Sequence, residues 1–363
     1  LDGLDPDQCK KNGNEILSHI SYLSQTIEVN ESNYNKPFSI ELTKTSYQIK
    51  EVVVKPGVNP AHRIIIAAYN NRNRNNPENL ESYRYTSYNK LYYTLDKIMA
   101  RKIRESGGDS IIKDSKFVQK LDSIKNKHGF MLIETVTQKE HQKPNNNFET
   151  VIASRVSGLK DPSIMFIATQ IQSFSFYNEK ITIADKIYLN PISGGSTKKY
   201  LFILEDTLFT PENDTLFVIS YRPHKDRNFE GLVGQLTINS RGYAVQSVIA
   251  EPSINVGILS VKIQQRYERI KDSTWFPVEL NTDLIITPPD NVNKKTGINY
   301  SMQMIGIGKS YLKDIEVNAT LSTKNFSHIE TVIDPKAGER NSAYWQLFRK
   351  DSLTALEMRT YRI

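Results

Sequence analysis

Residues 231–252 read GLVGQLTINSRGYAVQSVIAEP, and apolar and polar side chains alternate along this stretch on both sides of a short turn. Leu232, Leu236 and Ile238 form an apolar set, and the residues between them are largely polar. A period of two is typical of a strand with one buried face. Ser240-Arg241-Gly242 has the small and polar residues that favour a tight turn. The stretch therefore predicts an antiparallel hairpin with one face in a core.

The same pattern recurs along much of the chain. Further strands are predicted at 198–209, 214–223, 257–270, 273–287 and 298–312, with another turn at 271–273. Residues 129–140 and 148–156 predict a hairpin whose polar tip is 141–147. We therefore expect a mainly β protein with helices (α+β), built around an antiparallel meander.

A change of character marks the joint near residue 57. The stretch 47–66, YQIKEVVVKPGVNPAHRIII, is β-branched up to Lys55-Pro56-Gly57 and then adopts helical spacing. Asn59 and Pro60 are suited to the N-cap and first position of a helix, which should end before Pro77. Residues 1–57, with about three short strands, are predicted to form a separate, partial β-sandwich.

Residues 82–95 predict a strand, whereas residues 96–127 return to helical spacing and are interrupted by Gly107-Gly108. We therefore expect two helices over 96–127. A further short helix is expected near 161–170. Two more are expected in the tail, where Ser352 or Thr354 would cap the second.

Composition excludes several classes of function. The net charge is +7, but the basic residues are scattered among 40 acidic ones, so no nucleic-acid partner is expected. The single cysteine, Cys9, excludes an internal disulfide and a cysteine-rich zinc site. No apolar run reaches the ~20 residues of a membrane-spanning helix. Because the chain begins at Leu1 without a signal sequence, we expect that such a segment has been removed or left out.

Motifs for catalysis or cofactor binding are missing. The six histidines are far apart and form no HExxH motif. Gly194-Gly195-Ser196-Thr197-Lys198 lacks the spacing of a phosphate loop, and no GxSxG motif occurs. No carboxylate pair, including Glu205 and Asp206, is singled out for acid–base work. We expect no metal, no cofactor and no enzymatic activity.

Several stretches together resemble a family of cell-envelope proteins from Bacteroidota. These are 50–65 (KEVVVKPGVNPAHRII), 75–93 (NNPENLESYRYTSYNKLYY), 173–193 (SFSFYNEKITIADKIYLNPIS), 264–282 (QQRYERIKDSTWFPVELNT) and 348–361 (FRKDSLTALEMRTY). Family members carry a carboxypeptidase-regulatory-like sandwich, a linker and a domain of unknown function. The resemblance implies the periplasmic face of the outer membrane of a Gram-negative cell. It also implies a longer protein that is attached to the membrane by a C-terminal barrel absent from this chain.

The expected domains are a partial sandwich at 1–57, a linker and lid region at 58–128, an antiparallel half-barrel at 129–320 and a tail at 321–363. The strand order of 129–317 resembles the half-barrel of periplasmic lipoprotein carriers. That resemblance implies an apolar hollow beneath lid helices from 96–127 and 161–170. Alternatively, the protein's own helices fill the hollow. The side chains expected to bind a ligand there are Phe202, Leu204, Leu216, Val218, Leu236, Ile238, Val245, Leu259, Ile263 and Leu280.

Three functions remain open at this point. The first is a non-enzymatic envelope module that binds a lipid, a lipoprotein or a client protein. The second is a transport accessory that binds other outer-membrane proteins by strand addition through Glu51, Val52, Val53 and Val54. The third is a glycan or peptide hydrolase, which would need a cleft with converging carboxylates of perturbed pKa.

Overall fold

The computed structural model divides the chain into two compact units, Leu1–Gly57 and Val58–Ile363. It describes residues 13–17, 25–29, 40, 59–103, 109–111, 116–127, 129, 131–157, 174–183, 186–224, 229–254, 258–271, 274–289, 291–293, 298–322, 326 and 330–361. In the first unit, β1 (Gly13–Leu17) pairs antiparallel with β2 (Gln25–Val29). The proposed partner strand Glu51–Val54 lies outside the described residues, and the sandwich remains a prediction.

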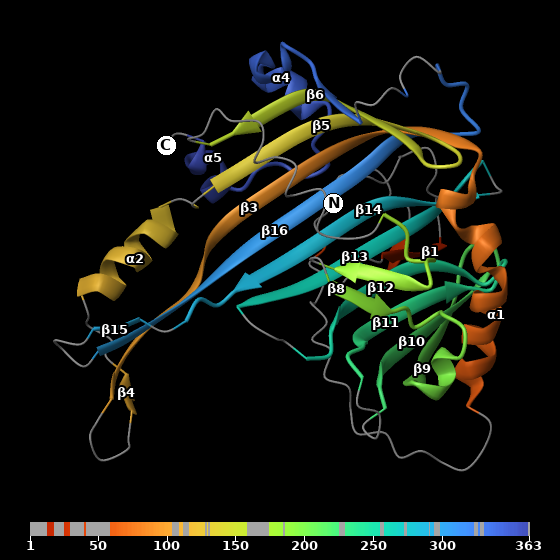
Figure 1. The fold of residues 1–363 in the computed structure, drawn as a ribbon, viewed down its shortest axis with the longest axis horizontal. Coiled ribbons are helices and arrows are strands. Elements are labelled where there is room, and N and C mark those ends of the chain that lie inside the picture. The colour runs from red at the N-terminus through yellow and green to blue at the C-terminus, as the bar shows by residue number, and fades with distance from the viewer. Residues whose placement is uncertain are drawn as a thin grey trace. The chain divides into compact units, whose positions relative to one another are not determined.

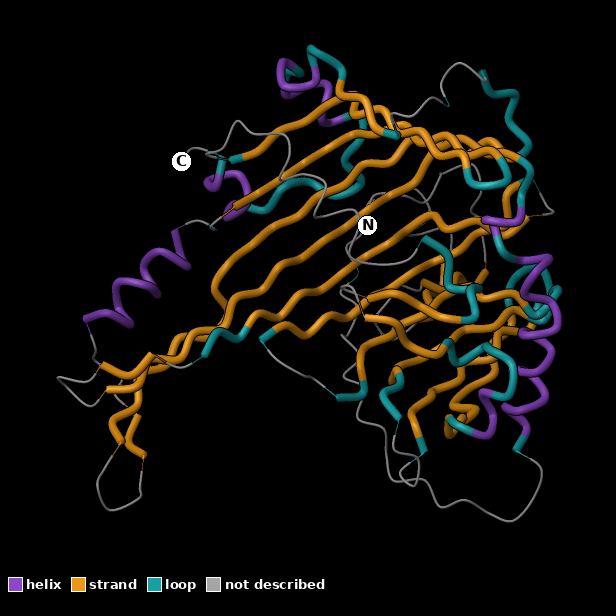
Figure 2. Tube along the Cα trace, viewed as in Figure 1, coloured by secondary structure: helices purple, strands orange, loops and turns teal. Residues whose placement is uncertain are grey.

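The second unit is built on one large, mostly antiparallel sheet, which confirms the mainly β fold class (Figure 1). Its strand order is β17-β6-β5-β3-β16-β14-β13-β12-β11-β10-β9, with β4 beside β3 and β15 beside β16. Among the described residues, the one parallel pair of this sheet is β17 with β6. Figure 2 shows the long strands running side by side, and among the described residues helices are few.

The strands that follow the first unit have these bounds: β3 Ser82–Ile103, β4 Asp109–Ile111, β5 Met131–Gln142, β6 Asn146–Val156, β7 Lys180–Ile183, β8 Lys186–Leu189, β9 Tyr200–Phe209, β10 Thr215–Pro223, β11 Leu232–Asn239, β12 Ala244–Pro252, β13 Leu259–Ile270, β14 Thr274–Ile286, β15 Asn291–Asn293, β16 Ile298–Val317 and β17 Thr331–Ile333. The helices are α1 Pro60–Asn75, α2 Lys116–Lys127, α4 Ser342–Gln346 and α5 Ala355–Thr360, with short 3-10 turns at Pro77–Asn79, Ser196–Lys198 and Ala337–Glu339. β7 and β8 form a separate two-stranded ribbon.

The helix predicted at the start of 96–127 is wrong, because β3 continues as a strand to Ile103. β3 pairs with β16 from Tyr83↔Val317 to Lys102↔Ile298, so a neighbouring strand satisfies its backbone groups. Apolar residues in this part of the sequence fit either period, and strand pairing decides between them. The second predicted helix of that region is present as α2.

The predicted linker and lid at 58–128 is also corrected. β3 lies between β16 and β5, within the sheet rather than above it. α1 packs against β9 and β12, whereas α2 lies beside the far end of β3 (Figure 1). α1 therefore covers the strands over which α2 was expected to form a lid. The other expected lid helix, 161–170, lies outside the described residues.

Local chemistry explains where α1 begins. Asn59 is its N-cap, accepting a hydrogen bond from the Ala61 amide at 3.0 Å, and Pro60 is its first residue. The Asn59 Nδ2 group also donates to the Phe202 carbonyl at 2.7 Å, which ties the start of α1 to β9. Ile64, Ile65 and other residues of one helix face are buried against the sheet. The helix is thus fixed both by its own cap and by the strand beneath it.

The segment before β7 completes this core. Phe176 and Tyr177 are buried in the cluster that α1 forms with β9–β13. The Tyr177 hydroxyl accepts a hydrogen bond from the Val245 amide at 2.8 Å, and the Tyr267 hydroxyl accepts one from the Phe176 amide at 2.9 Å. A buried phenol that keeps a hydrogen-bond partner avoids most of the cost of leaving water. The core is therefore a closed packing of aliphatic side chains and hydrogen-bonded tyrosines.

The tail packs on the other face of the sheet. Trp345 of α4 is buried against Tyr88, Val136 and Ala153. α5 begins with a capping box, in which Thr354 accepts from the Glu357 amide and the Glu357 side chain accepts from the Thr354 amide. Thr354, rather than Ser352, is therefore the cap. The expectation of two short tail helices is confirmed.

Adjacent residues of α1 provide a test of this packing. Ile65 is 1% exposed and Ile66 is 49% exposed. We expect Ile65→Ala to lower the free energy of unfolding by about 2–4 kcal/mol, because it leaves a cavity under the helix. Ile66→Ala, with the same chemical change, should alter it by less than about 1 kcal/mol. Urea denaturation of both variants measures the difference, and equal effects would contradict the observed packing of α1.

Candidate functional site

The apolar side chains predicted to bind a ligand are mostly covered by protein. Five of them are 0–1% exposed and belong to the cluster that includes α1, namely Phe202, Leu236, Ile238, Val245 and Ile263. Leu204 packs against the same cluster, whereas Leu259 is 39% exposed at the start of β13. Of the two alternatives for the hollow, the described residues favour the filled one. A ligand could reach these side chains only if α1 moved, and binding there stays a prediction.

Leu216 and Val218 do not share the face of the other predicted ligand-binding residues. In β10 the core side chains are Ile219 and Tyr221, and Phe217 packs against them. Because side chains alternate along a strand, Leu216 and Val218 lie on the opposite face. The segment 216–221 has apolar residues on both faces, so its sequence pattern could not identify the inward set. The expected placement of Leu216 and Val218 is therefore corrected.

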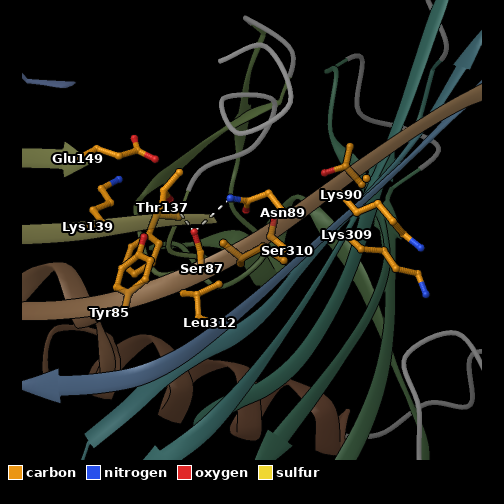
Figure 3. Close-up of a pocket in the computed structure, with 14 residues that line it drawn as sticks. Tyr85, Ser87, Asn89, Lys90, Thr137, Lys139, Glu149, Lys309, Ser310 and Leu312 are labelled. Carbon is orange, nitrogen blue, oxygen red and sulfur yellow. Dashed lines mark hydrogen bonds between the residues drawn. The ribbon is translucent and has the colours of Figure 1, made fainter. Parts of the chain in front are cut away.

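Leu280 leads to a different site. Together with residues of β3, β5, β6 and β16, it lines a pocket of about 320 Å³ (Figure 3). Along β3, Tyr85, Ser87 and Asn89 face this pocket, whereas the alternating residue Tyr88 is buried against the tail. The pocket and the tail therefore occupy opposite faces of the same strands.

Short polar side chains make up much of the pocket lining. Ser87 Oγ and Thr137 Oγ1 lie 2.8 Å apart and share a hydrogen bond between β3 and β5. Asn89 Nδ2 is 3.2 Å from both Ser87 Oγ and Thr135 Oγ1. Thr282 and Ser310 add further hydroxyls from β14 and β16. Figure 3 shows the Ser87, Thr137 and Asn89 side chains directed toward one another. They form a linked patch of neutral donors and acceptors.

Two side chains of opposite charge lie at one side of the pocket. Lys139 of β5 is directly across from Glu149 of β6, and both line the pocket. No ion pair joins them in the described part of the chain. Lys90 and Lys309 also border the pocket, but their ammonium groups pair with Glu357 at 2.8 Å and Asp351 at 3.1 Å. Figure 3 shows these two ammonium groups directed away from Ser87 and Thr137. Lys139 Nζ also lies 5.8 Å from the centroid of the Phe174 ring, so the described lining offers one cation beside an aromatic ring and one carboxylate.

An aromatic cluster adjoins the polar lining. Tyr85 and Phe174 are stacked with ring centroids 5.7 Å apart, and Phe276 contacts both rings edge-on. Leu280 and Leu312 pack in the same cluster. Burial raises the pKa of Tyr85 well above its ordinary value, with smaller contributions from Tyr83 and Glu149, so its hydroxyl stays protonated at neutral pH. One pocket thus combines a hydroxyl-rich part with an apolar end.

On the opposite face, a buried carboxylate holds the tail. Glu134 of β5 is fully buried and binds both Nε and Nη2 of Arg349, at 2.6 and 2.5 Å. It also accepts hydrogen bonds from the hydroxyls of Tyr88 and Tyr361. Burial acts to raise the pKa of Glu134. Hydrogen bonds from Arg349, Tyr361 and Tyr88 outweigh burial, so the pKa is lower than the ordinary 4.5.

The pocket contains little that could support metal or acid–base chemistry. Among the described residues, no three His, Cys, Asp or Glu side chains gather as a metal site would require. Among the described residues that line the pocket, Glu149 is the one carboxylate. Within the same part of the chain, no helix is long and apolar enough to cross a membrane.

Sequence reasoning missed the polar residues of the pocket. Ser87 and Asn89 lie on the β3 face that also carries Tyr83, Tyr85 and Leu91. Two small polar residues on an otherwise apolar strand face were the available signal. Thr137 and Ser310 gave no such signal, because only strand pairing brings them beside Ser87 and Asn89.

A family comparison identifies most of the second unit. Residues 64–302 match a family described as "Family of unknown function (DUF5686)", which covers more than half of the chain. The chain belongs to this family. The matched range starts within α1 and ends at residue 302 in β16, so it contains the pocket-lining residues of β3, β5, β6 and β14 but not those of β16. No curated protein matches the sequence.

Solved structures give only distant likenesses. A DUF1329 family protein from Desulfovibrio piger is 9% identical with a TM-score of 0.28, over 75% of this chain and 98% of that chain. A putative outer membrane lipoprotein-sorting protein domain from Vibrio parahaemolyticus is 11% identical with a TM-score of 0.27, over 74% and 97% of the two chains. A LolA superfamily protein from Nitrosomonas europaea is 8% identical with a TM-score of 0.24, over 75% and 98%. Scores this low carry no argument about function.

The ion pair between Glu134 and Arg349 is open to direct test. Arg349→Met should lower the free energy of unfolding by about 3–5 kcal/mol, because it leaves a buried carboxylate without its cation. The neighbouring Lys350 is half-exposed, and its Nζ lies 3.9 Å from Glu279. Lys350→Met should therefore cost less than about 1 kcal/mol. Thermal and urea denaturation of the two variants give the comparison.

Acidification offers a second readout of the same pair. The pKa of Glu134 is lower in the folded chain than its ordinary 4.5, so the unfolded chain binds the proton more readily. The stabilisation is present above pH 4.5 and is lost as the pH falls below that value. In the Arg349→Met variant, the loss of unfolding free energy between neutral pH and acidic pH should be smaller than in the wild type. An unchanged pH profile in the variant would contradict the role assigned to the pair.

Proposed function

We propose that this chain is a non-enzymatic module that binds an amphipathic ligand, either a lipid or the acylated part of a lipoprotein. The observation that carries the proposal is the pocket on β3, β5, β14 and β16. Its hydroxyl and amide side chains lie directly beside the cluster of Tyr85, Phe174, Leu280 and Leu312. A molecule with a polar group and an apolar chain matches both parts of this lining.

The pocket size limits how the ligand is held. At about 320 Å³ the pocket suits a polar group and a short length of chain, not a whole diacyl lipid. Each methylene that leaves water contributes about 0.8 kcal/mol, so even a short buried length adds measurable affinity. The rest of the ligand would extend from the pocket along the protein surface.

The location we propose is the periplasmic face of the outer membrane. The support is the resemblance of several stretches, among them 348–361, to envelope proteins of Bacteroidota. Attachment through a C-terminal barrel, outside this chain, belongs to the same proposal. Other outer-membrane proteins are the expected neighbours in that setting.

A hydrolase fits the pocket less well than a binding module. Most glycosidases use a pair of carboxylates flanking the bond to be cleaved. In the described part of the pocket lining, no second carboxylate faces Glu149. The buried Glu134 is on the opposite face and is already bound by Arg349, Tyr88 and Tyr361. We therefore favour binding without catalysis.

Native mass spectrometry of the gently extracted protein tests this function. We expect lipid to copurify with the wild type. Ser310 lines the pocket and is half-buried, so Ser310→Trp should fill the space and reduce bound lipid about fivefold or more. Ile285 is 38% exposed and is not among the residues that line the pocket. Ile285→Trp is therefore a control that introduces the same side chain outside the pocket.

Circular dichroism and thermal denaturation must show that both variants remain folded. A wild type that carries no lipid would overturn the proposal. So would a folded Ser310→Trp variant that retains lipid at the level of Ile285→Trp.

A further inference from the structure

We infer that the polar part of the ligand is a neutral, polyhydroxylated group, that is, a sugar unit joined to an apolar chain. This inference rests on the proposed function and specifies its ligand. It is drawn from the charge balance and the unpaired hydrogen-bonding atoms of the pocket.

Charge balance argues against a phosphate or other anionic head group. Lys90 and Lys309 border the pocket, but their ammonium groups lie on the tail face of the sheet, where they pair with Glu357 and Asp351. The remaining cation, Lys139, lies across the β5–β6 pair from Glu149, whose carboxylate would repel an anion. Among the described residues, no arginine lines the pocket and no helix begins at it. Phosphate sites typically use these features.

Hydrogen-bonding capacity argues for hydroxyl groups. Asn89 uses its Nδ2 group on Ser87 and Thr135, and its Oδ1 atom has no partner among the described residues. Ser310 Oγ and the Glu149 carboxylate likewise have no side-chain partner in that part of the chain. The lining therefore offers carbonyl, carboxylate and hydroxyl acceptors together with the Lys139 ammonium and hydroxyl donors. A sugar hydroxyl both donates and accepts, so it can satisfy either kind.

The apolar end determines what the sugar is joined to. Tyr85 and Phe174 are stacked on each other, so their faces are in part taken up within the aromatic cluster. Leu312 lies directly across from Ser87 and Leu280 directly across from Ser310, so the apolar lining adjoins the hydroxyl patch. A free sugar would leave this surface in contact with water. An alkyl or acyl chain attached to the sugar would cover it, which gives a glycolipid-like ligand.

Two detergents with the same alkyl chain separate the head groups. Octyl β-glucoside and the anionic octyl phosphate are titrated below their micelle concentrations into the full chain, and binding is measured by isothermal titration calorimetry. We expect the glucoside to bind at least tenfold more tightly. The Ser310→Trp substitution, which fills the pocket, should weaken this binding. Equal or tighter binding of the octyl phosphate would overturn the inference while leaving the proposed function intact. If neither detergent binds, the proposed function itself fails.

A matched pair of hydroxyl deletions locates the binding. Thr137→Val removes a hydroxyl from the pocket without changing side-chain size, and its partner Ser87 lies 2.8 Å away. Thr237 and Ser247 form a similar cross-strand hydroxyl pair at 3.0 Å that does not line the pocket. Thr137→Val should weaken glucoside binding about tenfold, and Thr237→Val should leave it unchanged. Equal effects of the two variants, both folded, would show that the sugar does not bind at this patch.

Discussion

The pairing of β3 with β16 over most of their length places two chemistries back to back. On one face of β3, Tyr85, Ser87 and Asn89 line the pocket. On the other, Tyr88 and Lys90 contact the tail through Glu134 and Glu357. Because a strand turns successive side chains to opposite faces, a shift of one residue in register would exchange the two sets. The pocket and the tail contacts therefore depend on the same register.

The tail contacts help to fix that register. A charged group on a buried strand face is tolerated only with a partner, and Glu134 and Lys90 find theirs in Arg349 and Glu357. A slipped strand would bring these charges to the pocket face without their partners. The buried ion pairs thus act against wrong pairings at least as much as they stabilise the correct one. The cost of burying them is consistent with a role in specifying the fold.

Much of the strand content could be predicted, since alternation and turn residues mark the hairpins from residue 200 onward. The cap at Asn59 and Pro60 was equally clear, because capping chemistry is local. The extension of β3 to Ile103 could not be predicted, since the spacing of Ile98, Met99 and Ile103 fits both a helix and a strand. The predicted inward face of β10 was wrong for a related reason, because apolar residues occupy both faces of this strand. In each case the pairing with a neighbouring strand determines the local structure, which the local sequence does not.

The site shows the same limit more sharply. We predicted an apolar hollow because many aliphatic residues were expected to face inward. The sequence alone could not show that α1 and Phe176 cover these residues. The pocket instead depends on polar residues from strands that are distant in sequence, such as Ser87 beside Thr137. Neutral polar side chains on a buried strand face weaken a core unless something bonds to them. Ser87, Thr137 and Asn89 meet part of this requirement by bonding to one another, and the proposed ligand would use the capacity that Asn89 Oδ1 and Ser310 Oγ retain.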